Sequence, residues 1–507
     1  MIAALEKGAG SNTWIRDFTA SIVVFLVAMP LCMGIAIASG VPAEKGLITG
    51  IIGGVVVGFI AGSPLQVSGP AAGLAVIVFE FVTEFGLAAL GPVLLLAGIL
   101  QVVAGALKLG GFFRSISPAV VHGMLAGIGA LIVIGQFHIL FDGKPLPSGL
   151  ENIAAMPGQI LGLSLNDVSS TEWALFIGLV TIGTMLAWEK WRPTSLKLVP
   201  GALLGVTAAT LAAWLLQLDV ARIDVPASIF GSLEVPGAGF FATLAQPAII
   251  VSALAIAFIA SAETLLSAAA VDRMHDGVRT DYNKELRAQG VGNLLCGLAG
   301  ALPMTGVIVR SSANVQAGAV TRWSTILHGV WILGFVALLP WLLREVPMAA
   351  LGGILVVTGW RLVSLSHVQH LFSNYGLLPA AIWAVTFILV VTTDLLTGVL
   401  VGLGLSLVEL YQHRSSLRLK VEEDHAEDEN ASRLSLQGSA TFVSLTRLTS
   451  ILEGIPSGRS VHLDLNGLRG LDHTSTEMVR EWVARRRAGG QTVEFSGSES
   501  LIARLAH

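Results

Sequence analysis

The sequence predicts an all-α polytopic membrane protein with fourteen membrane segments and a small α/β domain at its C-terminal end. Of its 507 residues, 53% are hydrophobic and 13% are charged, whereas soluble chains carry about 25% charged residues. Apolar runs long enough to span a bilayer recur up to Tyr411, and the composition turns polar beyond it. Two more apolar segments, 65–73 and 302–310, are broken by glycine and proline.

Twelve apolar runs are expected to be membrane helices, because a spanning helix needs about 20 apolar residues. The broken segments, at about 64–84 and 303–318, are too short to cross. We expect them to be half-helices, each preceded by an extended stretch. This gives seven elements per half, so the second half inserts upside down relative to the first. The twelve runs are 17–39, 44–62, 88–107, 116–140, 173–188, 198–217, 247–271, 288–302, 323–342, 347–364, 376–394 and 395–411.

The loops predict a multi-pass protein of the cell inner membrane with both termini in the cytoplasm. Lys108 and Arg114 lie in a loop expected inside, whereas the loops 141–172 and 218–246, expected outside, are mostly acidic. This asymmetry follows the positive-inside rule. Residues 1–17 lack the pattern of a cleaved signal peptide, so the first run is expected to be retained.

The C-terminal part predicts a separate soluble unit. Residues 461–465 and 492–495 alternate like strands, and residues 474–487 have a helical pattern. The expected domains are a cytoplasmic segment 1–16, a transmembrane domain 17–413 with repeats of about 17–217 and 247–413, an acidic linker 414–432, and the α/β domain 433–507.

The paired breaks predict a binding site near the bilayer midplane, since non-helical backbone at that depth must line a cavity or be buried in protein. The free N–H groups and positive dipole ends of two half-helices would attract an anion there. The alternative is a pair of packing kinks without a ligand. The expected substrate-binding residues are Ser68, Gly69, Pro70, Ala71, Thr305, Gly306, Val307, Arg310 and Cys32.

Two ionisable residues lie within apolar segments, where a charge is costly and marks a functional site by default. Arg310 is expected to add positive potential behind the anion, and the alternative is an arginine that reaches the membrane surface. Glu263 is expected to gain and lose a proton or to bind a cation, and the alternative is a permanent ion pair with Arg310. Glu80 and Glu84 are further candidates of the same kind.

Pro30 interrupts the first run and removes a backbone hydrogen bond there. The first and eighth elements are equivalent in an inverted repeat. Cys32 and its apolar neighbours are therefore expected to face Glu263 across the site. The alternative is a kinked helix packed on its neighbours.

The turn 471–477 joins a strand to a helix in the C-terminal domain. Asp472 is expected in the N-cap region. Exposed hydroxyls at Thr474 and Ser475 would allow this helix end to bind a nucleotide or accept a phosphate, and simple capping is the alternative.

Several function classes lack their motifs. The sequence contains no Gly-x4-Gly-Lys-Ser/Thr phosphate loop, no His-Glu-x2-His pair and no Cys-x2-Cys pair. We therefore expect no enzyme, no cofactor and no metal. Cys32 and Cys296 lie in apolar surroundings, so no disulfide is expected. The net charge of -4 says nothing useful about nucleic acid, and no nucleic-acid partner is expected.

The chain resembles the SulP (sulfate permease) family of anion transporters along essentially its whole length. The motifs are Gln66-Val-Ser-Gly-Pro70, residues 114–123 (RSISPAVVHG) and residues 283–293 (NKELRAQGVGN). The tail is similar to a STAS domain, with 472–475 at its strand-to-helix turn. The resemblance implies core and gate domains, elevator-like alternating access, an anion between the third and tenth elements, a homodimer, and a regulatory partner at the STAS-like domain.

The resemblance also implies roles for single residues. Glu263 matches the family's coupling carboxylate, and Arg310 matches its cation in the tenth element. In sodium-using bicarbonate transporters of the family the carboxylate is Asp, with two hydroxyl partners. Here Ser267 keeps one hydroxyl and Ile308 replaces the other, which favours a proton over sodium. The Asp-His-Thr sequence of the tail resembles bacterial members associated with carbonic anhydrases, which keeps bicarbonate as a substrate.

The predicted function is secondary-active, proton-coupled transport of a small anion (sulfate, bicarbonate or a dicarboxylate) across the lipid bilayer. The alternatives are sodium-coupled bicarbonate uptake, a passive anion channel or exchanger on the same scaffold, and a nucleobase transporter with the same inverted-repeat plan.

Overall fold

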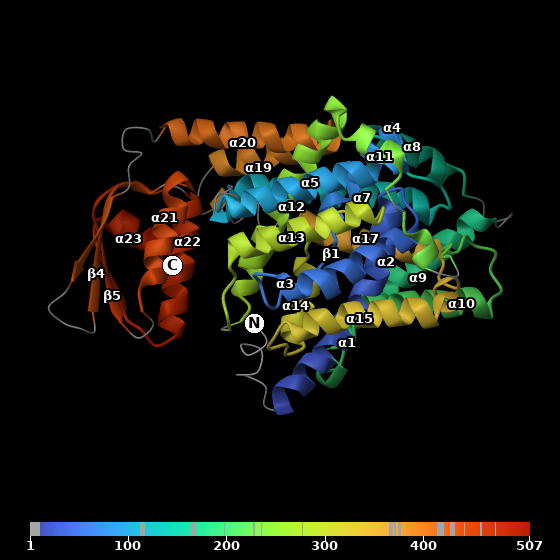
Figure 1. Ribbon diagram of the computed structural model, residues 1–507, viewed down its shortest axis with the longest axis horizontal. Helices are drawn as coiled ribbons and strands as arrows, with labels where there is room; N and C mark the ends of the chain where they lie inside the picture. The colour runs from blue at the N-terminus through green and yellow to red at the C-terminus, as the bar shows by residue number, and fades with distance from the viewer. Residues whose placement is uncertain are drawn as a thin grey trace. The chain divides into compact units, whose positions relative to one another are not determined.

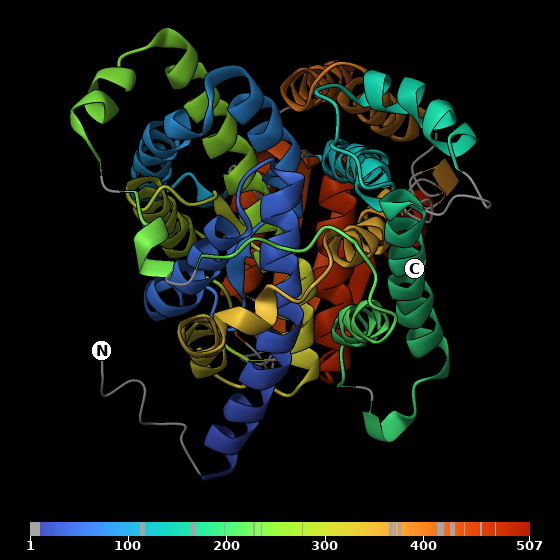
Figure 2. The same ribbon diagram turned by 90° about the vertical axis from the view of Figure 1, so that its right-hand side faces the viewer.

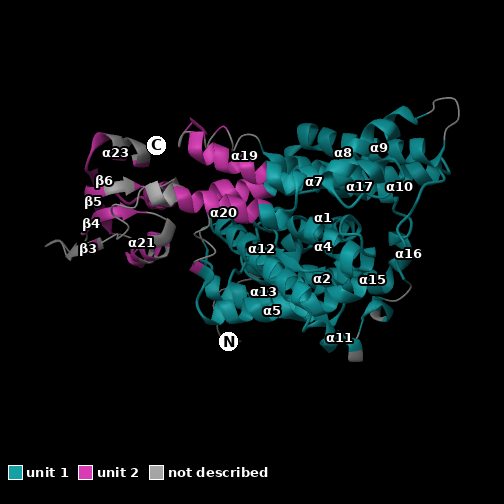
Figure 3. Cartoon of the chain, turned by 90° about the horizontal axis from the view of Figure 1, so that it is seen from above, with its two compact units in different colours: residues 1–110, 125–364, 388–397 teal, residues 111–124, 365–387, 398–507 magenta. Residues whose placement is uncertain are grey.

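The computed structural model describes residues 11–111, 117–163, 169–196, 198–226, 229–234, 236–275, 277–364, 369, 372–373, 377–412, 420–425, 431–440, 442–456, 459–471 and 473–506. The chain divides into two compact units (Figure 3). Unit 1 comprises residues 1–110, 125–364 and 388–397, and unit 2 comprises residues 111–124, 365–387 and 398–507. Unit 2 takes in parts of the last apolar helices.

All twelve expected runs form helices, and six helices among the described residues are long and apolar enough to cross a membrane. The helices of this region are α1 (Ser11–Ala38), α2 (Ala43–Ile51), the π-helix η2 (Ile52–Val57), α3 (Gly58–Ile60), α4 (Ala72–Phe85), η3 (Leu87–Ala89), α5 (Leu90–Ala106), α7 (Pro118–Leu140), α8 (Gly149–Leu161), α9 (Ser170–Trp191), η4 (Thr194–Leu196), α10 (Gly201–Leu215), η5 (Ile229–Ser232), α11 (Ala238–Thr243), α12 (Pro247–Asp272), α13 (Tyr282–Leu298), α14 (Ile308–Gln316), α15 (Trp323–Leu338), α16 (Pro340–Leu343), α17 (Met348–Val363), α19 (Leu377–Thr392) and α20 (Leu395–Gln412).

The two loops expected outside contain helices of their own. Helix α8 lies within 141–172, and η5 and α11 lie within 218–246. Ser148 caps α8 by accepting a hydrogen bond from the backbone N–H of Glu151. Helix α8 was not predicted because it is shorter than a membrane-spanning run. It has 13 residues, with Pro157 inside it.

Helix α1 runs through the middle of unit 1 in the view of Figure 2 and packs on α2, α14 and α15. Pro30 lies within it, as predicted, without ending the helix. The neighbouring helix α2 continues into the π-helix η2, an unusual element that often occurs at functional sites. A side chain at Gly53 in η2 would stand 2.6 Å from the Ser68 carbonyl oxygen, so glycine allows η2 to approach the first broken segment.

Helices α5 and α13 pack closely side by side (Figure 3). Glycines spaced by seven residues face one another here. A Cβ at Gly98 would lie 2.6 Å from the Gly290 carbonyl oxygen, and a Cβ at Gly297 would lie 2.7 Å from the Gly91 carbonyl oxygen. Small residues at such spacing let helix backbones approach within a membrane. The backbones of α5 and α13 therefore lie close together.

The C-terminal part forms a four-stranded sheet in the order β3-β4-β5-β6. Its strands are β3 (Lys420–His425), β4 (Ala431–Ala440), β5 (Ser460–Leu471) and β6 (Val493–Ser496), and its helices are α21 (Phe442–Gly454), α22 (His473–Ala488) and α23 (Glu499–Ala506) (Figure 1). Strand β3 is antiparallel to β4, and the remaining pairs are parallel.

Alternation along the strands places the core of this sheet on one face. In β5, Val461, Leu463 and Leu465 are buried, whereas His462 and Asp464 lie on the more accessible face. The strands predicted at 461–465 and 492–495 and the helix predicted at 474–487 are confirmed. Strand β3 lies inside the segment expected as a linker, 414–432, which differs from the prediction.

Candidate functional site

The two broken segments meet as a short antiparallel ladder. Strand β1 (Ser68–Pro70) pairs with β2 (Met304–Gly306), and Gly69 is opposite Thr305. The backbone N–H of Val307 extends the ladder by donating to the Val67 carbonyl oxygen at 2.9 Å. The extended stretches predicted in both halves are therefore present. Their pairing, between residues more than 230 positions apart, brings the starts of α4 and α14 to one place.

Polar side chains from neighbouring helices hold this ladder. Asn293 of α13 accepts a hydrogen bond from the Met304 N–H at 2.7 Å and donates one to the Met304 carbonyl oxygen at 3.1 Å. Thr49 of α2 exchanges two hydrogen bonds with the backbone of Leu302, both 2.9 Å. Gln289 donates to the Ser68 hydroxyl at 2.6 Å. Buried backbone groups are thus satisfied without forming a helix, as required inside a membrane protein.

Both half-helices begin without a side-chain cap. The N-cap residues are Ala71, with φ −107° and ψ 134°, and Val307, with φ −107° and ψ 114°, and no described side chain caps either end. The nearly equal torsions fit an internal repeat. Helix ends of this kind leave first-turn N–H groups free and carry a positive partial charge, so they form ready sites for an anion.

Arg310 is fully buried in the first turn of α14. Its Nη2 lies 3.4 Å from the Pro70 carbonyl oxygen, while Nε and Nη1 have no hydrogen-bond partner in the described part of the chain. A Cβ at Gly69 would stand 2.2 Å from Nη1, so the guanidinium lies directly against β1. Arg310 is thus buried within its element. An arginine that reaches the membrane surface would have an exposed guanidinium instead.

Glu263 of α12 lies beside the first turn of α4. A Cβ at Gly73 would stand 2.6 Å from Oε2 and 2.8 Å from Oε1 of this carboxylate. Oε2 has no hydrogen-bond partner among the described residues, and the same is true of two nitrogens of Arg310. Glu263 and Arg310 therefore form no ion pair in this structure. Ser267 is buried one turn further along α12.

Cys32 contributes from α1. Its side chain is fully buried and lies next to the Arg310 guanidinium, against Gly50 of α2. The sequence predicted that it would face Glu263, and the structure places it beside the cation instead. Thr305 is also fully buried, and its hydroxyl lies 3.4 Å from the neighbouring Gly306 carbonyl oxygen.

The backbone N–H groups of Gly306 and Val307, two of the expected substrate-binding residues, both have partners in this structure. The N–H of Val307 is used by the ladder, and the N–H of Gly306 donates to Thr264 Oγ1 at 3.2 Å. These two N–H groups already have partners in this structure, so the N–H groups left for an anion at this end are those inside the first turn of α14. Thr264 is a site residue that the sequence reading missed, although it follows Glu263 directly.

Gln66 is a second residue whose role was missed. It donates from Nε2 to the Thr264 carbonyl oxygen at 3.0 Å, and its Oε1 is buried without a partner among the described residues. A Cβ at Gly306 would overlap Gln66 Nε2, at 1.3 Å. The glycine of the second broken segment therefore makes room for the glutamine of the first.

The candidate residues of the C-terminal domain are Asp472, Thr474 and Ser475. Asp472 lies outside the described residues, and Thr474 and Ser475 lie in the first turn of α22. Ser475 is buried, which differs from the exposed hydroxyl that was expected.

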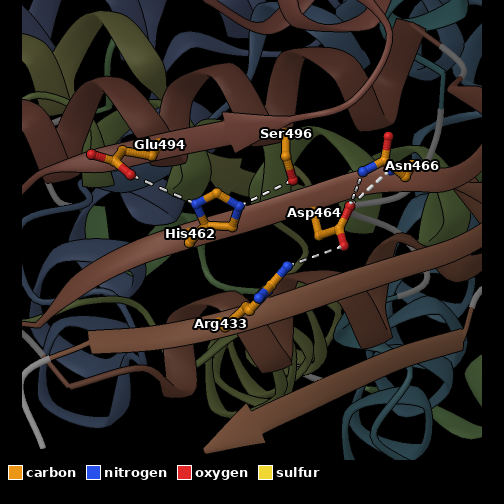
Figure 4. A network of polar contacts seen from close by, with 6 residues as sticks. All are labelled: Arg433, His462, Asp464, Asn466, Glu494 and Ser496. Atoms are coloured by element: carbon orange, nitrogen blue, oxygen red, sulfur yellow. Dashed lines mark hydrogen bonds and ion pairs between the residues drawn. The ribbon is translucent and has the colours of Figure 1, made fainter. Parts of the chain in front are cut away.

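The accessible face of the tail sheet carries a polar network instead (Figure 4). His462 lies 3.0 Å from Ser496 Oγ, and Arg433 lies 3.8 Å from Asp464. The backbone N–H of Asn466 donates to Asp464 Oδ1 at 3.0 Å, and this is the main reason that the pKa of Asp464 is lowered.

Comparison with known proteins agrees with this geometry. The sulfate permease family model matches residues 15–386. A putative sulfate transporter of Bacillus subtilis, YvdB, is 30% identical, covering 99% of this chain and 94% of that protein. The bicarbonate transporter BicA of a Picosynechococcus strain is 27% identical, covering 82% of this chain and 73% of that protein.

Solved structures share the fold. The transmembrane domain of a cyanobacterial bicarbonate transporter, BicA, has a TM-score of 0.66 at 23% identity, covering 78% of this chain and 98% of that one. The murine anion transporter Slc26a9 in its inward-facing state has a TM-score of 0.70 at 15% identity, covering 100% of this chain and 89% of that one.

Two half-helices that start from a buried ladder, within a bundle of apolar helices, define the class of inverted-repeat membrane transporters. The chain belongs to the sulfate permease family. The predicted fold class is confirmed, and the C-terminal sheet with its helices fits a STAS domain.

Proposed function

We propose that this protein carries a small oxyanion across the inner membrane together with a proton. One observation carries the proposal: the fully buried Arg310 has no carboxylate partner among the described residues and lies beside two uncapped helix ends. A buried cation without a counter-charge is unfavourable. An anion bound between α4 and α14 would supply that charge and accept hydrogen bonds from Arg310 Nε and Nη1.

The substrate is proposed from this chemistry and from the relatives. A guanidinium pairs best with planar or tetrahedral oxyanions, whose several oxygens accept parallel hydrogen bonds. The relatives are named as sulfate and bicarbonate transporters. Sulfate and bicarbonate are therefore the first candidates, and a small dicarboxylate is the next.

The coupling is assigned to Glu263. Its carboxylate lies against Gly73 in the first turn of α4, whereas the Arg310 guanidinium lies against Gly69 of β1. Ser267 is one helical turn from Glu263. A carboxyl group that binds a proton moves through the membrane without a net charge. A sodium ion would need several more oxygen ligands, and Ile308 supplies none at the position where a hydroxyl was expected. Sodium remains the alternative.

The ladder supports movement of the site as one body. Because β1 and β2 are paired and held by Asn293 and Thr49, α4 and α14 are tied together. We propose an elevator-like cycle in which these elements move against the remaining helices. The domain limits, the cytoplasmic termini, a homodimer and a regulatory role for 472–475 belong to the same proposal and rest on the family resemblance.

Purified protein in proteoliposomes tests the proposal. Wild type should concentrate radiolabelled sulfate or bicarbonate when an inward proton gradient is imposed. Glu263→Gln should lose this accumulation and keep anion exchange, since the anion site remains. Glu84→Gln is the matched control, because Glu84 is an exposed carboxylate of the same region.

Three outcomes would contradict parts of the proposal. Uptake that only equilibrates would favour the passive channel. Accumulation that follows a sodium gradient and ignores pH would assign sodium to Glu263. Thermal stabilisation by uracil or xanthine, without stabilisation by sulfate or bicarbonate, would favour the nucleobase transporter.

A further inference from the structure

A small cavity lies along α4, beyond the candidate anion site. Its volume is about 50 Å³, and it is lined by α4, by the last turns of α7 and by the turn that leads into α8. A buried water needs roughly 10–15 Å³ of such space. The cavity can therefore hold a few water molecules, but its polar lining decides whether it does.

The turn over this cavity has its polar groups paired within itself. Asn152 accepts a hydrogen bond from the Leu146 N–H at 2.8 Å and donates to the carbonyl oxygens of Leu146 and Ser148 at 2.8 and 2.7 Å. Two other lining residues take no part in these bonds. Glu80 is half-buried on α4, and Gln136 on α7 is 2% exposed with an Oε1 that has no partner in the described structure.

Glu80 also lies on a defined face of α4. It follows Gly73, the contact of Glu263, by seven residues, which is close to two helical turns and about 10 Å. Positions seven apart lie on nearly the same face of a helix. Glu80 is thus placed two turns from the anion site on the face that leads to it.

The charges around Glu80 are predominantly negative. Asp394, in the turn before α20, is the charged group whose field acts on Glu80, and its oxygens accept two hydrogen bonds from Thr397 at 2.8 and 2.6 Å. Helix α5, which packs on α4, carries no charged residue, and α1 carries its charges at its far end. The other titratable groups of the surrounding elements are Glu84, Glu263, His138 and Glu151, together with Asp142 and the cation Lys144 in the turn before α8. Cys32 on α1, His122 on α7 and Asp272 on α12 lie in more distant parts of their helices.

We propose that Glu80 is a proton-dependent filter for anions that enter along α4. It acts at the end of this helix that is farther from the β1–β2 ladder. An ionised Glu80, next to Asp394, repels an anion that enters along α4. When one of its oxygens takes up a proton that water in the cavity relays from the external solution, the charge is removed and the anion passes. Gln136 Oε1 accepts a hydrogen bond from that water. This inference rests on the proposed anion transport, and it does not depend on the role of Glu263.

The test is the initial rate of sulfate uptake into proteoliposomes as a function of external pH. Glu80→Gln mimics the protonated carboxyl, so its uptake at alkaline external pH should exceed that of wild type, by roughly 10-fold, the lower end of focused electrostatic effects on association. Glu84→Gln, one turn along the same helix and exposed, should behave as wild type. High ionic strength should reduce the difference, because it screens the repulsion.

A second variant should change the pH dependence of uptake in the opposite direction. Gln136→Glu places a carboxylate beside the same cavity and should shift uptake to more acidic external pH. Damage to the fold lowers uptake and cannot produce the gain expected of Glu80→Gln. Equal pH profiles of wild type and Glu80→Gln, together with a lost profile in Glu263→Gln, would overturn this inference alone. A wild type that takes up neither sulfate nor bicarbonate would overturn the proposed function and this inference with it.

Discussion

Arg310 and Gly69 are in direct contact across the two halves of the sequence: a Cβ at position 69 would stand 2.2 Å from Arg310 Nη1. The glycine of the first broken segment thus makes room for the cation of the second. This contact explains why glycine is needed in an extended strand, where it ordinarily weakens pairing.

Gly69→Ala should therefore displace the guanidinium. We expect the anion dissociation constant to rise by the equivalent of about 1–3 kcal/mol, the scale of a lost charge-assisted hydrogen bond. Isothermal titration with sulfate or bicarbonate measures it. Gly183→Ala is the control, since no atom lies within 4 Å of a Cβ at that position in α9. Equal affinities for both variants would mean that the guanidinium position does not matter.

Arg310→Met should have opposite effects on stability and binding. Removing a buried charge without a partner should raise the unfolding free energy of the anion-free protein by about 1–3 kcal/mol. Its melting temperature should rise accordingly. The same change should abolish stabilisation by added anion, which measures binding to the native state. Thermal melts with and without sulfate check both effects. Arg361→Met, which removes an exposed partner of Glu189, should change neither. A lower melting temperature in both conditions would make Arg310 a structural residue.

Cys32 should report on occupancy of the site. It is buried beside Arg310, so a water-soluble thiol reagent reaches it only when the site is open to one aqueous phase. We expect bound anion to slow labelling of Cys32 in a Cys296→Ala background by at least severalfold. Cys296, which is also buried, should stay unlabelled in a Cys32→Ala background. Labelling of Cys32 at a rate independent of anion would separate it from the site.

Asp464 should make the tail sheet sensitive to acid. Its pKa is lowered, first by the Asn466 N–H, so the ionised form stabilises the fold. This contribution is complete above the usual carboxyl range near pH 3.9 and is lost as the pH falls through the lowered pKa. Asp464→Asn should weaken the tail by about 1 kcal/mol at neutral pH, with a difference that shrinks in acid. Hydrogen exchange of β5 and β6 in the full chain, corrected for intrinsic rates, measures it.

The control for this change is Glu494→Gln on the adjacent strand, whose side chain is 71% exposed. It should alter protection little at any pH. A difference between Asp464→Asn and wild type that grows in acid would contradict the assigned sign.

Local patterns in the sequence were sufficient for the apolar helices, the two half-helices and the buried charges. They could not reveal contacts between distant segments. Nothing near Met304 indicates that Asn293 holds it, and nothing near Gln66 indicates that Gly306 makes room for it. The seven-residue glycine spacing of α5 and α13 was visible in the sequence, but its meaning depends on which helices meet.

Strand β3 was missed for a different reason. Residues 420–425 are rich in charge, and charged residues are typical of linkers. They are equally typical of edge strands, where charge prevents unwanted pairing. Only the hydrogen-bonded register with β4, from Lys420 opposite Gln437 to His425 opposite Ser432, distinguishes the two.

The β1–β2 ladder has a consequence for the energetics of the whole cycle. In the proposed elevator-like cycle, a site whose two halves are tied by backbone hydrogen bonds moves without being split, so an anion would meet the same ladder residues from either face of the membrane. The same ladder residues would then contribute to the affinity on both faces, and the direction of net flux would follow from the ion gradients. A single set of residues, Gln66 to Pro70 and Met304 to Arg310, would therefore set loading and release together, and no substitution there could improve one without altering the other.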